Sequence, residues 1–325
     1  MYGEIALLSG TANRPLAEAI SRELNVPLIG ADVFKFPNQN IFCRLHASVR
    51  GKDVFVIQPT CATEHDDGDT ASVNDNLMEL LIMMDTLSRD SAGRISAVVP
   101  YYGYGRTDKK DQPRVPITAR LVADLISTAG ANRFLTLDLH AGQIQGFFSI
   151  PVDELTAFHM LSDYFRAKAI PDAVVIAADI GATKRARNFA AALEMPLAII
   201  EKRRVQRPDG SRAKALNVIG EVEGKNVIIF DDEIDTAGTV TQAIVFLRAA
   251  GANLVYVCAT HPCFSDPAPE RLSSVEIEEI VVTDTVPLPP RKLLPNITVL
   301  SVAPLLAEVI RRIHLGISVG ALFNE

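Results

Sequence analysis

Residues 227–239 hold the side chains best suited to chemistry in this chain. Four apolar residues, three of them β-branched, precede the adjacent carboxylates Asp231 and Asp232, and a loop of small residues and hydroxyls follows. The apolar run is typical of a parallel strand buried on both faces. The spacing beyond Thr239 predicts a helix that ends at Gly251. Amides and the helix dipole at such a junction favour a phosphate, while the carboxylates can accept from sugar hydroxyls or hold a magnesium ion.

A purely structural turn is the alternative explanation for this segment, with Asp235 or Thr236 capping the helix. A cap needs one such side chain, whereas the strand end carries two carboxylates as well. The pattern therefore favours a site for a phosphorylated sugar. It resembles the phosphoribosyl diphosphate (PRPP) signature shared by type I phosphoribosyltransferases and PRPP synthetases, and by itself it does not separate these two families.

Polar side chains also follow other predicted strands. Asp179 comes after an apolar strand at 173–178, His140 follows a second one, and Lys202 lies beyond a strand at 197–200. On residue types alone, a charged loop is most often solvated and a single histidine at a strand end is most often structural. By themselves, these three residue types therefore do not identify a binding or catalytic site.

Composition limits the classes of protein to which the chain can belong. Its 325 residues favour two domains, and 48% hydrophobic residues are ample for two cores. The net charge of −7 argues against a general nucleic-acid surface and against binding to anionic membranes. The four cysteines lack a CxxC spacing, which favours free thiols in a reducing cytoplasm. We expect a cytoplasmic protein without a signal peptide or membrane-spanning segment.

A repeated phrase indicates an internal duplication. Residues 129–132 and 250–253 both read Ala-Gly-Ala-Asn, and each is followed by a predicted strand with a histidine ten residues after the glycine. Two α/β halves of like topology, joined near residue 155, are the simplest account. Chance similarity of a common helix–glycine–strand phrase is the alternative. A final helix at 304–314 has one apolar stripe and is expected to return to the first half.

Several long segments resemble one family over nearly the whole chain. They are residues 74–81, 110–124, 138–148 and 283–289, together with the end of the chain. In this order they resemble class I PRPP synthetases, also called ribose-phosphate diphosphokinases. The resemblance runs from about residue 5 to Phe323, apart from a few extra residues near 64–72.

The resemblance implies both a fold and a reaction. The fold is α/β, with two tandem type I phosphoribosyltransferase-like domains, each a mostly parallel sheet flanked by helices. The first domain would span 1–155, with helix 304–325 packing back onto it, and the second would span 156–303 and carry the PRPP motif. The C1 hydroxyl of ribose 5-phosphate would attack the β-phosphorus of Mg-ATP to give PRPP and AMP. Mg²⁺ would be the cofactor, and the protein would be a homo-oligomer built from dimers, usually a hexamer.

The family's functional residues match named positions in this sequence. Ribose 5-phosphate would be bound by Asp231, Asp232, Asp235, Thr236, Ala237, Gly238 and Thr239. The diphosphate loop would be Asp179, Ile180, Gly181 and Ala182. ATP would be bound by Phe36, Asn38, Asn40, Arg106, Thr107 and Asp111, with the residues of the 36–40 segment supplied by a neighbouring subunit. Catalytic charge neutralisation would fall to Lys202 and Arg204, magnesium ligation to His140 and Asp179, and an allosteric phosphate or ADP site to Arg114, Gln145, Asp153 and Ser318.

Four departures from the family pattern keep other readings open. Asn40 replaces a Glu, Thr107 a Gln, Ala182 a Gly and Glu233 a Met. They motivate a second hypothesis, a catalytically weakened regulatory paralogue, and a third is a phosphoribosyltransferase that consumes PRPP. The sequence leaves open the choice of nucleotide donor, the oligomer's size and any allosteric control.

Overall fold

The computed structural model describes residues 3–64, 68, 70–206 and 212–320, with side chains outside 202–216. The chain divides into two compact units. Unit 1 comprises Met1–Thr156, Asp284–Pro289 and Ser301–Glu325, and unit 2 comprises Ala157–Thr283 and Pro290–Leu300. Within the described residues, none of the helices combines the length and hydropathy needed to cross a membrane.

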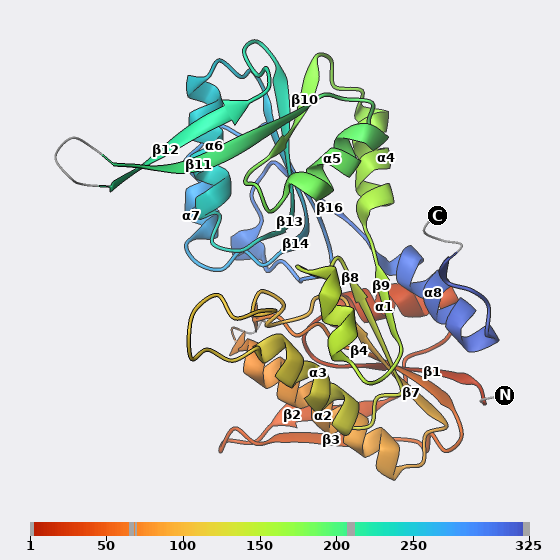
Figure 1. Cartoon of the computed structure of the whole chain (residues 1–325). Coiled ribbons are helices and arrows are strands. Elements are labelled where there is room, and N and C mark those ends of the chain that lie inside the picture. Colours follow the sequence, from red (N-terminus) through yellow and green to blue (C-terminus); the bar gives the residue numbers. More distant parts are fainter. Residues whose placement is uncertain (1–2, 65–67, 69, 207–211, 321–325) are drawn as a thin grey trace. The chain divides into compact units, whose positions relative to one another are not determined.

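Unit 1 is built on a five-stranded parallel sheet (Figure 1). Its strands are, in spatial order, β1 (Ile5–Ser9), β4 (Asp53–Ile57), β7 (Arg94–Val99), β8 (Arg133–Leu137) and β9 (Val152–Leu155). All five residues of β4 are buried, as expected for a strand covered on both faces.

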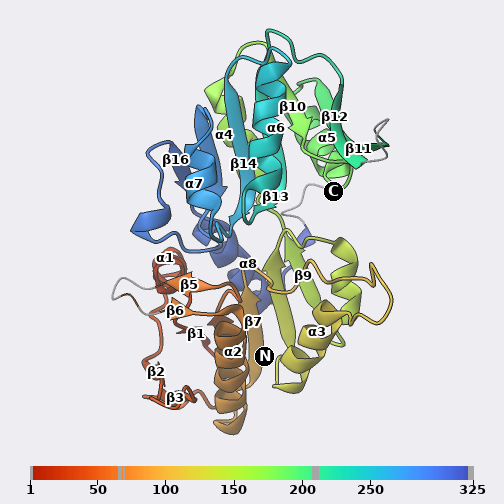
Figure 2. The ribbon, with the colours of Figure 1, turned by 90° about the vertical axis from the view of Figure 1, so that its left-hand side faces the viewer.

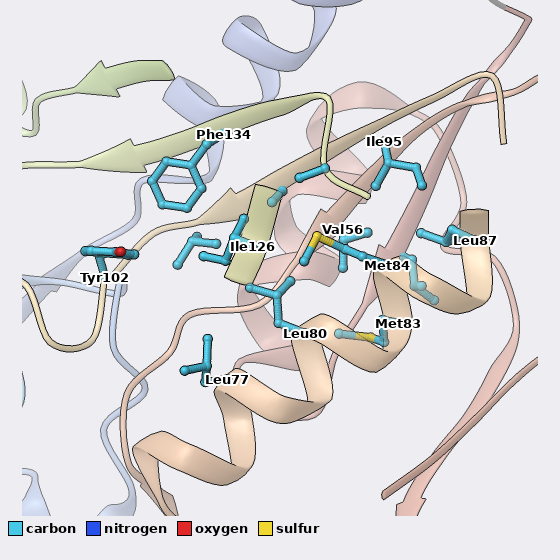
Figure 3. Close-up of a cluster of buried hydrophobic side chains, with 14 of the residues drawn as sticks. Val56, Leu77, Leu80, Met83, Met84, Leu87, Ile95, Tyr102, Ile126 and Phe134 are labelled. Atoms are coloured by element: carbon cyan, nitrogen blue, oxygen red, sulfur yellow. The ribbon is translucent and has the colours of Figure 1, made fainter. Parts of the chain in front are cut away.

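Helices cover both faces of this sheet. On one face lie α2 (Val73–Arg89), which begins with a capping box between Ser72 and Asp75, and α3 (Thr118–Thr128). Figure 3 shows α2 presenting Leu80 and Met84 to Val56 of β4. On the other face, α1 (Arg14–Leu24) packs against α8 (Ala303–Leu315), so the last helix of the chain belongs to unit 1 (Figures 1 and 2).

A buried cluster of Asp53, Arg94 and His314 links α8 to the sheet of unit 1. Asp53 is fully buried and accepts from Arg94 Nε at 2.7 Å, while the Nδ1 atom of His314 lies 2.8 Å from Asp53 Oδ2. Arg94 also donates to the carbonyl of Ile313 at 3.1 Å. A buried carboxylate is tolerated because it is both paired and hydrogen-bonded.

Short elements complete unit 1. An antiparallel hairpin joins β2 (Ala31–Lys35) to β3 (Ile41–Leu45), and a smaller one joins β5 (Thr63–Glu64) to β6 (Thr70–Ala71) within the extra residues near 64–72. A 3₁₀ helix, η1 (Gly142–Phe147), lies between β8 and β9.

Unit 2 is built on a seven-stranded sheet in the order β12-β11-β10-β13-β14-β15-β16, in which only β12 is antiparallel. The strands are β10 (Ala173–Ala177), β11 (Leu197–Gln206), β12 (Arg212–Ile219), β13 (Asn226–Ile234), β14 (Val255–Pro262), β15 (Glu279–Thr283) and β16 (Ile297–Leu300). One face carries α4 (Phe158–Lys168) and α5 (Thr183–Ala192). The other carries α6 (Gly238–Ala249) and α7 (Ala268–Ser273) (Figures 1 and 2). A 3₁₀ turn, η2 (Pro290–Lys292), precedes β16. The predicted α/β class with mostly parallel sheets flanked by helices is confirmed.

The two units repeat one topology, but not in the register that the Ala-Gly-Ala-Asn phrase predicts. In the sheet of unit 2, β10 lies between β11 on one side and β13 on the other. In unit 1, the bridge from Leu28 pairs with one side of β1 and β4 pairs with the other. This topology makes β1 equivalent to β10, β4 to β13, and β7 to β14, whereas the phrase would pair β7 with β13.

The local sequence supports the topological register. Leu24-Asn25-Val26-Pro27-Leu28 at the end of α1 matches Leu193-Glu194-Met195-Pro196-Leu197 at the end of α5, and both Asn25 (φ 54°) and Glu194 (φ 55°) are left-handed. The repeated Ala-Gly-Ala-Asn segment is instead a C-terminal capping sequence that α3 and α6 share. Gly130 and Gly251 both have positive φ; the N–H of Asn132 then donates to Ile95 of β7, and that of Asn253 donates to Lys225, just before β13.

Candidate active site

The acidic pair lies within β13, not after it as the sequence predicts. β13 pairs with β10 only as far as Phe230, but with β14 as far as Ile234. The ladder to β14 therefore carries Asp231 and Asp232 beyond the carboxyl end of β10. The helices after β10 and β13 cover opposite faces of the sheet, so this is the topological switch point, where α/β sheets bind ligands.

One arginine, Arg185, lies beside the two carboxylates of the acidic pair Asp231 and Asp232. Asp232 is 4% exposed and accepts from Arg185 Nη2 at 2.9 Å, and the same Nη2 lies 3.9 Å from Asp231 Oδ1. The Asp232 N–H donates to Asp231 Oδ1 at 2.9 Å. Burial, together with the neighbouring Asp232 carboxyl, raises the pKa of Asp231 well above its ordinary value. Arg185 therefore supplies the cation that this pair of carboxylates needs.

Residues 235–237 join β13 to α6 at the same edge, and Gly238 and Thr239 are the first two residues of that helix. Ala237 is left-handed (φ 57°), which turns the chain into the helix, and its carbonyl accepts from the N–H and hydroxyl of Thr241. The first amides of α6 are thereby presented at the loop, where they and the helix dipole favour an anion.

Arg271 of α7 supports this loop. Its Nη1 donates to the carbonyl of Thr236 at 2.9 Å. A Cβ at Gly238 would lie 3.2 Å from the same Nη1, closer than most Cβ contacts. Glycine at 238 therefore allows the guanidinium to lie directly beside the loop.

The candidate diphosphate loop lies between β10 and α5. Asp179 Oδ1 accepts from the Ala182 N–H at 3.0 Å, and the Asp179 carbonyl accepts from the Thr183 hydroxyl at 3.4 Å. Ala182 is 2% exposed with an ordinary φ of −76°. The backbone at this position therefore does not require the glycine that the family has there.

Lys202 and Arg204 lie on a strand, whereas the sequence predicts a charged loop. β11 continues past its pairing with β10, because β12 supplies an antiparallel partner as far as Gln206. Lys202 is opposite Leu216, and Arg204 is opposite Lys214. The side chains of both residues lie outside the described part of the chain, and their catalytic role stays a prediction.

The candidate adenine pocket residues lie at the turn between β2 and β3 in unit 1. The Phe36 N–H donates to the Asn40 carbonyl at 2.8 Å, and Asn38 Oδ1 accepts from the Asn40 N–H at 3.1 Å. Phe36 is 42% exposed, and its ring contacts Phe34 edge-on at 5.1 Å between centroids. An exposed aromatic face on a side-chain-braced turn fits stacking on a base.

The candidate ATP loop connects β7 to α3, also in unit 1. Arg106 and Asp111 are exposed, and the Thr107 hydroxyl donates to the Tyr104 carbonyl at 2.7 Å. His140 is exposed just after β8, where Asp138 takes a positive φ of 36°. These side chains are therefore accessible to a ligand.

Three of the four candidate allosteric residues, Gln145, Asp153 and Ser318, bond to neighbours within unit 1. Asp153 forms an ion pair with Arg133, and Gln145 donates to Glu154. The Ser318 carbonyl accepts from Arg312 at 3.0 Å, and Arg114 has a left-handed φ of 66°. Their allosteric role stays a prediction.

The candidate metal ligands are divided between the units, with His140 in unit 1 and Asp179 in unit 2. Among the residues described, no three His, Cys, Asp or Glu side chains gather closely enough to hold a metal ion. The Ala182 amide uses only one oxygen of Asp179, a hard donor that suits magnesium, whereas imidazole is an unusual ligand for it.

Arg185 and Arg271 are the functional candidates that sequence reasoning missed. Arg185 is 47 positions from Asp232, and Arg271 is 35 positions from Thr236. For Arg185 the available signal was a basic residue in the first turn of the helix after the Asp179 loop. No local pattern pointed to Arg271.

Comparisons with known proteins agree with this arrangement. Residues 5–130 match the N-terminal domain of ribose phosphate pyrophosphokinase, and residues 205–324 match the phosphoribosyl synthetase-associated domain. A ribose-phosphate pyrophosphokinase from Caldanaerobacter subterraneus subsp. tengcongensis is 51% identical over 98% of both chains, and one from Campylobacter jejuni is 48% identical over 98% of both.

A solved structure is also similar over nearly the whole chain. The crystal structure of phosphoribosylpyrophosphate synthetase from Mycobacterium smegmatis is 42% identical and has a TM-score of 0.88. It covers 97% of this chain and 100% of its own. On the strength of these matches, the chain belongs to the ribose-phosphate pyrophosphokinase family.

Proposed function

We propose that this protein transfers the diphosphoryl group of Mg-ATP to the C1 hydroxyl of ribose 5-phosphate, giving PRPP and AMP. The observation that carries the proposal is the switch point of unit 2. There the acidic pair, the 235–239 loop and the start of α6 lie at one sheet edge, in a chain that belongs to this enzyme family.

Ribose 5-phosphate is held by unit 2 in this proposal. Backbone amides of 235–239 and the hydroxyls of Thr236 and Thr239 receive the 5-phosphate, since helix N-termini favour anions. Asp231 and Asp232 accept hydrogen bonds from ribose hydroxyls. The loop at 179–182 receives the diphosphoryl group.

ATP is held by residues of unit 1 in this proposal. Phe36 stacks on the adenine, with hydrogen bonds from Asn38 and Asn40, while Arg106, Thr107 and Asp111 contact the nucleotide. Because the family takes the adenine-binding hairpin from a neighbouring subunit, the active form is a homo-oligomer assembled from dimers, as a hexamer. Arg114, Gln145, Asp153 and Ser318 form its regulatory phosphate site.

Charge neutralisation is the main catalytic demand of phosphoryl-type transfer. Lys202 and Arg204 neutralise charge as the bridging oxygen of ATP departs. His140 and Asp179 are the protein ligands of Mg²⁺, which when bound offsets the negative charge of the phosphate oxygens. We place the functional domain boundaries at 1–155 and 156–303, with helix 304–325 on the first domain, and the protein in the cytoplasm.

One assay tests this proposal against its alternatives. The purified chain receives ATP, Mg²⁺ and ribose 5-phosphate in phosphate buffer, and AMP and PRPP are followed together. Equal rates of AMP and PRPP formation are expected. Absence of both at high enzyme concentration would reject the synthetase function and favour a regulatory paralogue. Release of pyrophosphate from added PRPP and a base would instead identify a phosphoribosyltransferase.

A further inference from the structure

Arg185 connects two parts of the candidate site that the sequence separates. It is the third residue of α5, and its guanidinium reaches β13. There Nη2 lies 2.9 Å from Asp232 and 3.9 Å from Asp231. One cation therefore faces two adjacent carboxylates.

The balance of charge makes the acidic pair depend on this cation. Asp232 is 4% exposed, and a buried carboxylate that loses its partner leaves an uncompensated charge. Asp231 receives the Asp232 N–H on the oxygen nearest Arg185, so the positions of the two carboxylates are linked. If the guanidinium were removed, their mutual repulsion would move or protonate one of them.

The backbone that carries Arg185 is also the backbone of the diphosphate loop. Ala182 donates to Asp179 within that loop, and its carbonyl accepts from the Ala186 N–H in the first turn of α5. Arg185 thus projects from a turn whose start is fixed by the loop itself. Its side chain therefore connects the helix turn that follows the loop at 179–182 to the acidic pair, through the bond from Nη2 to Asp232.

We propose that Arg185 is a positioning residue for ribose 5-phosphate, holding Asp231 and Asp232 in the geometry that accepts the ribose hydroxyls and fixing the pair to the diphosphate loop. The inference rests on the proposed function of unit 2. It assigns no contact between Arg185 and substrate, because its Nη2 atom already faces the protein's own carboxylates.

The test compares Arg185→Gln and Arg185→Lys with Arg187→Gln, an exposed arginine two residues along the same helix. In Arg185→Gln, the KM for ribose 5-phosphate is expected to rise at least about tenfold, because a charge-assisted hydrogen bond is lost. The KM for ATP is expected to stay within about twofold. Arg185→Lys keeps the charge but not the planar fork, so it is expected to recover part of the affinity. Arg187→Gln is expected to behave as the unsubstituted protein.

Two further measurements keep the outcomes distinct. Calorimetric titration of ribose 5-phosphate, without ATP, is expected to show the same loss of affinity, and thermal unfolding shows whether each variant is folded. If Arg185→Gln does not fold, an unchanged ribose 5-phosphate KM in Arg185→Lys rejects the proposal. A change in kcat that leaves both KM values unchanged also rejects the proposal. Equal rises in the KM for ribose 5-phosphate and the KM for ATP reject it as well. Failure of the unsubstituted protein to form PRPP would reject the proposed function instead.

Discussion

Arg271 shows how a single distant side chain can shape the candidate phosphate loop. It donates to the Thr236 carbonyl and lies against Gly238. Within the loop, Ala237 alone is left-handed, and its neighbours must hold that turn in place. A guanidinium at this point both braces the backbone and raises the local positive potential for an anion.

Replacing Arg271 is therefore expected to weaken binding of ribose 5-phosphate. Arg271→Gln loses about 0.5–1.5 kcal/mol of hydrogen bonding, which corresponds to a rise of about two- to tenfold in KM for ribose 5-phosphate. Steady-state kinetics with each substrate varied in turn checks this, with Arg187→Gln as the matched control. An unchanged KM for ribose 5-phosphate would show that the loop does not need this brace.

Lys202 and Arg204 give the second prediction at the residue scale. Lys202→Ala and Arg204→Ala are each expected to lower kcat by at least about a hundredfold, because each removes charge stabilisation made in the transition state. Binding of ribose 5-phosphate, measured by calorimetry, is expected to persist. Lys225→Ala, at the exposed ion pair with Asp172, is a suitable control. Near-normal kcat in both active-site variants would remove these residues from the mechanism.

At the scale of elements, the core of the candidate site could be predicted from sequence, whereas the lengths of its strands could not. The apolar run of β13 and the spacing of α6 indicated strand, loop and helix directly. The sequence placed Asp231 just after the end of its strand and Lys202 in a loop, because strand propensity is weak among charged residues. Backbone ladders to β14 and β12 override that weak preference. Arg185 and Arg271 could not be predicted because only tertiary packing brings them to the site.

Side chains of α4, β15 and β16 in unit 2 form a charged cluster with a predictable pH response. Glu279 accepts from the Tyr164 hydroxyl at 2.5 Å and the Thr298 hydroxyl at 2.6 Å, and lies 2.9 Å from Lys168 Nζ. Burial alone would raise the pKa of Glu279, but the bonds from Lys168, Thr298 and Tyr164 outweigh it and lower that pKa below its ordinary value.

A lowered pKa in the folded state fixes the sign of the pH dependence. The stability that ionised Glu279 contributes is fully present above about pH 4.3, the ordinary glutamate value, and is lost as the pH falls through the lowered folded value. Glu279→Gln is thus expected to lower the thermal midpoint at pH 7 but to differ less from the unsubstituted protein near pH 3. Glu278→Gln, exposed beside it, is the control. A difference that stays constant with pH would contradict this assignment.

At the scale of the whole chain, two repeated units differ at equivalent switch points. In unit 2 the loops after β10 and β13 carry the candidate substrate-binding residues. In unit 1 the loops after β1 and β4 are instead bonded to the protein's own side chains. Glu79 accepts from the Thr11 N–H at 2.6 Å and from Gln58 at 2.9 Å, while Gln58 Oε1 accepts from the Ala12 N–H at 3.1 Å.

The same region of unit 1 is tightly packed. A Cβ at Gly10 would lie 2.2 Å from Gln58 Oε1 and 2.8 Å from Glu79 Oε1, and Gln58 is fully buried. The amides that could receive an anion are therefore already satisfied by a carboxylate and an amide side chain. The switch point of unit 2 thus carries the candidate substrate-binding residues, whereas that of unit 1 is occupied by the protein's own side chains.

This difference predicts a structural role for Glu79. Glu79→Ala removes the acceptor of the Thr11 N–H, at about 1–3 kcal/mol for a buried donor left unpaired, and leaves the Gln58 amide with its longer bonds to Asn76 at 3.4 and 3.5 Å. Glu79→Gln can keep its carbonyl oxygen at the Thr11 N–H and the Gln58 amide and place its NH₂ group at the Thr11 hydroxyl, which can accept, so it is expected to destabilise less than Glu79→Ala. Thermal unfolding of both variants measures the effect. The control is Asp85→Asn on the same helix, where the exposed carboxylate pairs only with Arg89 among the described residues and little change is expected. A Glu79→Ala midpoint equal to that of Asp85→Asn would mean that water satisfies these donors, and that the switch point of unit 1 is open to ligands after all.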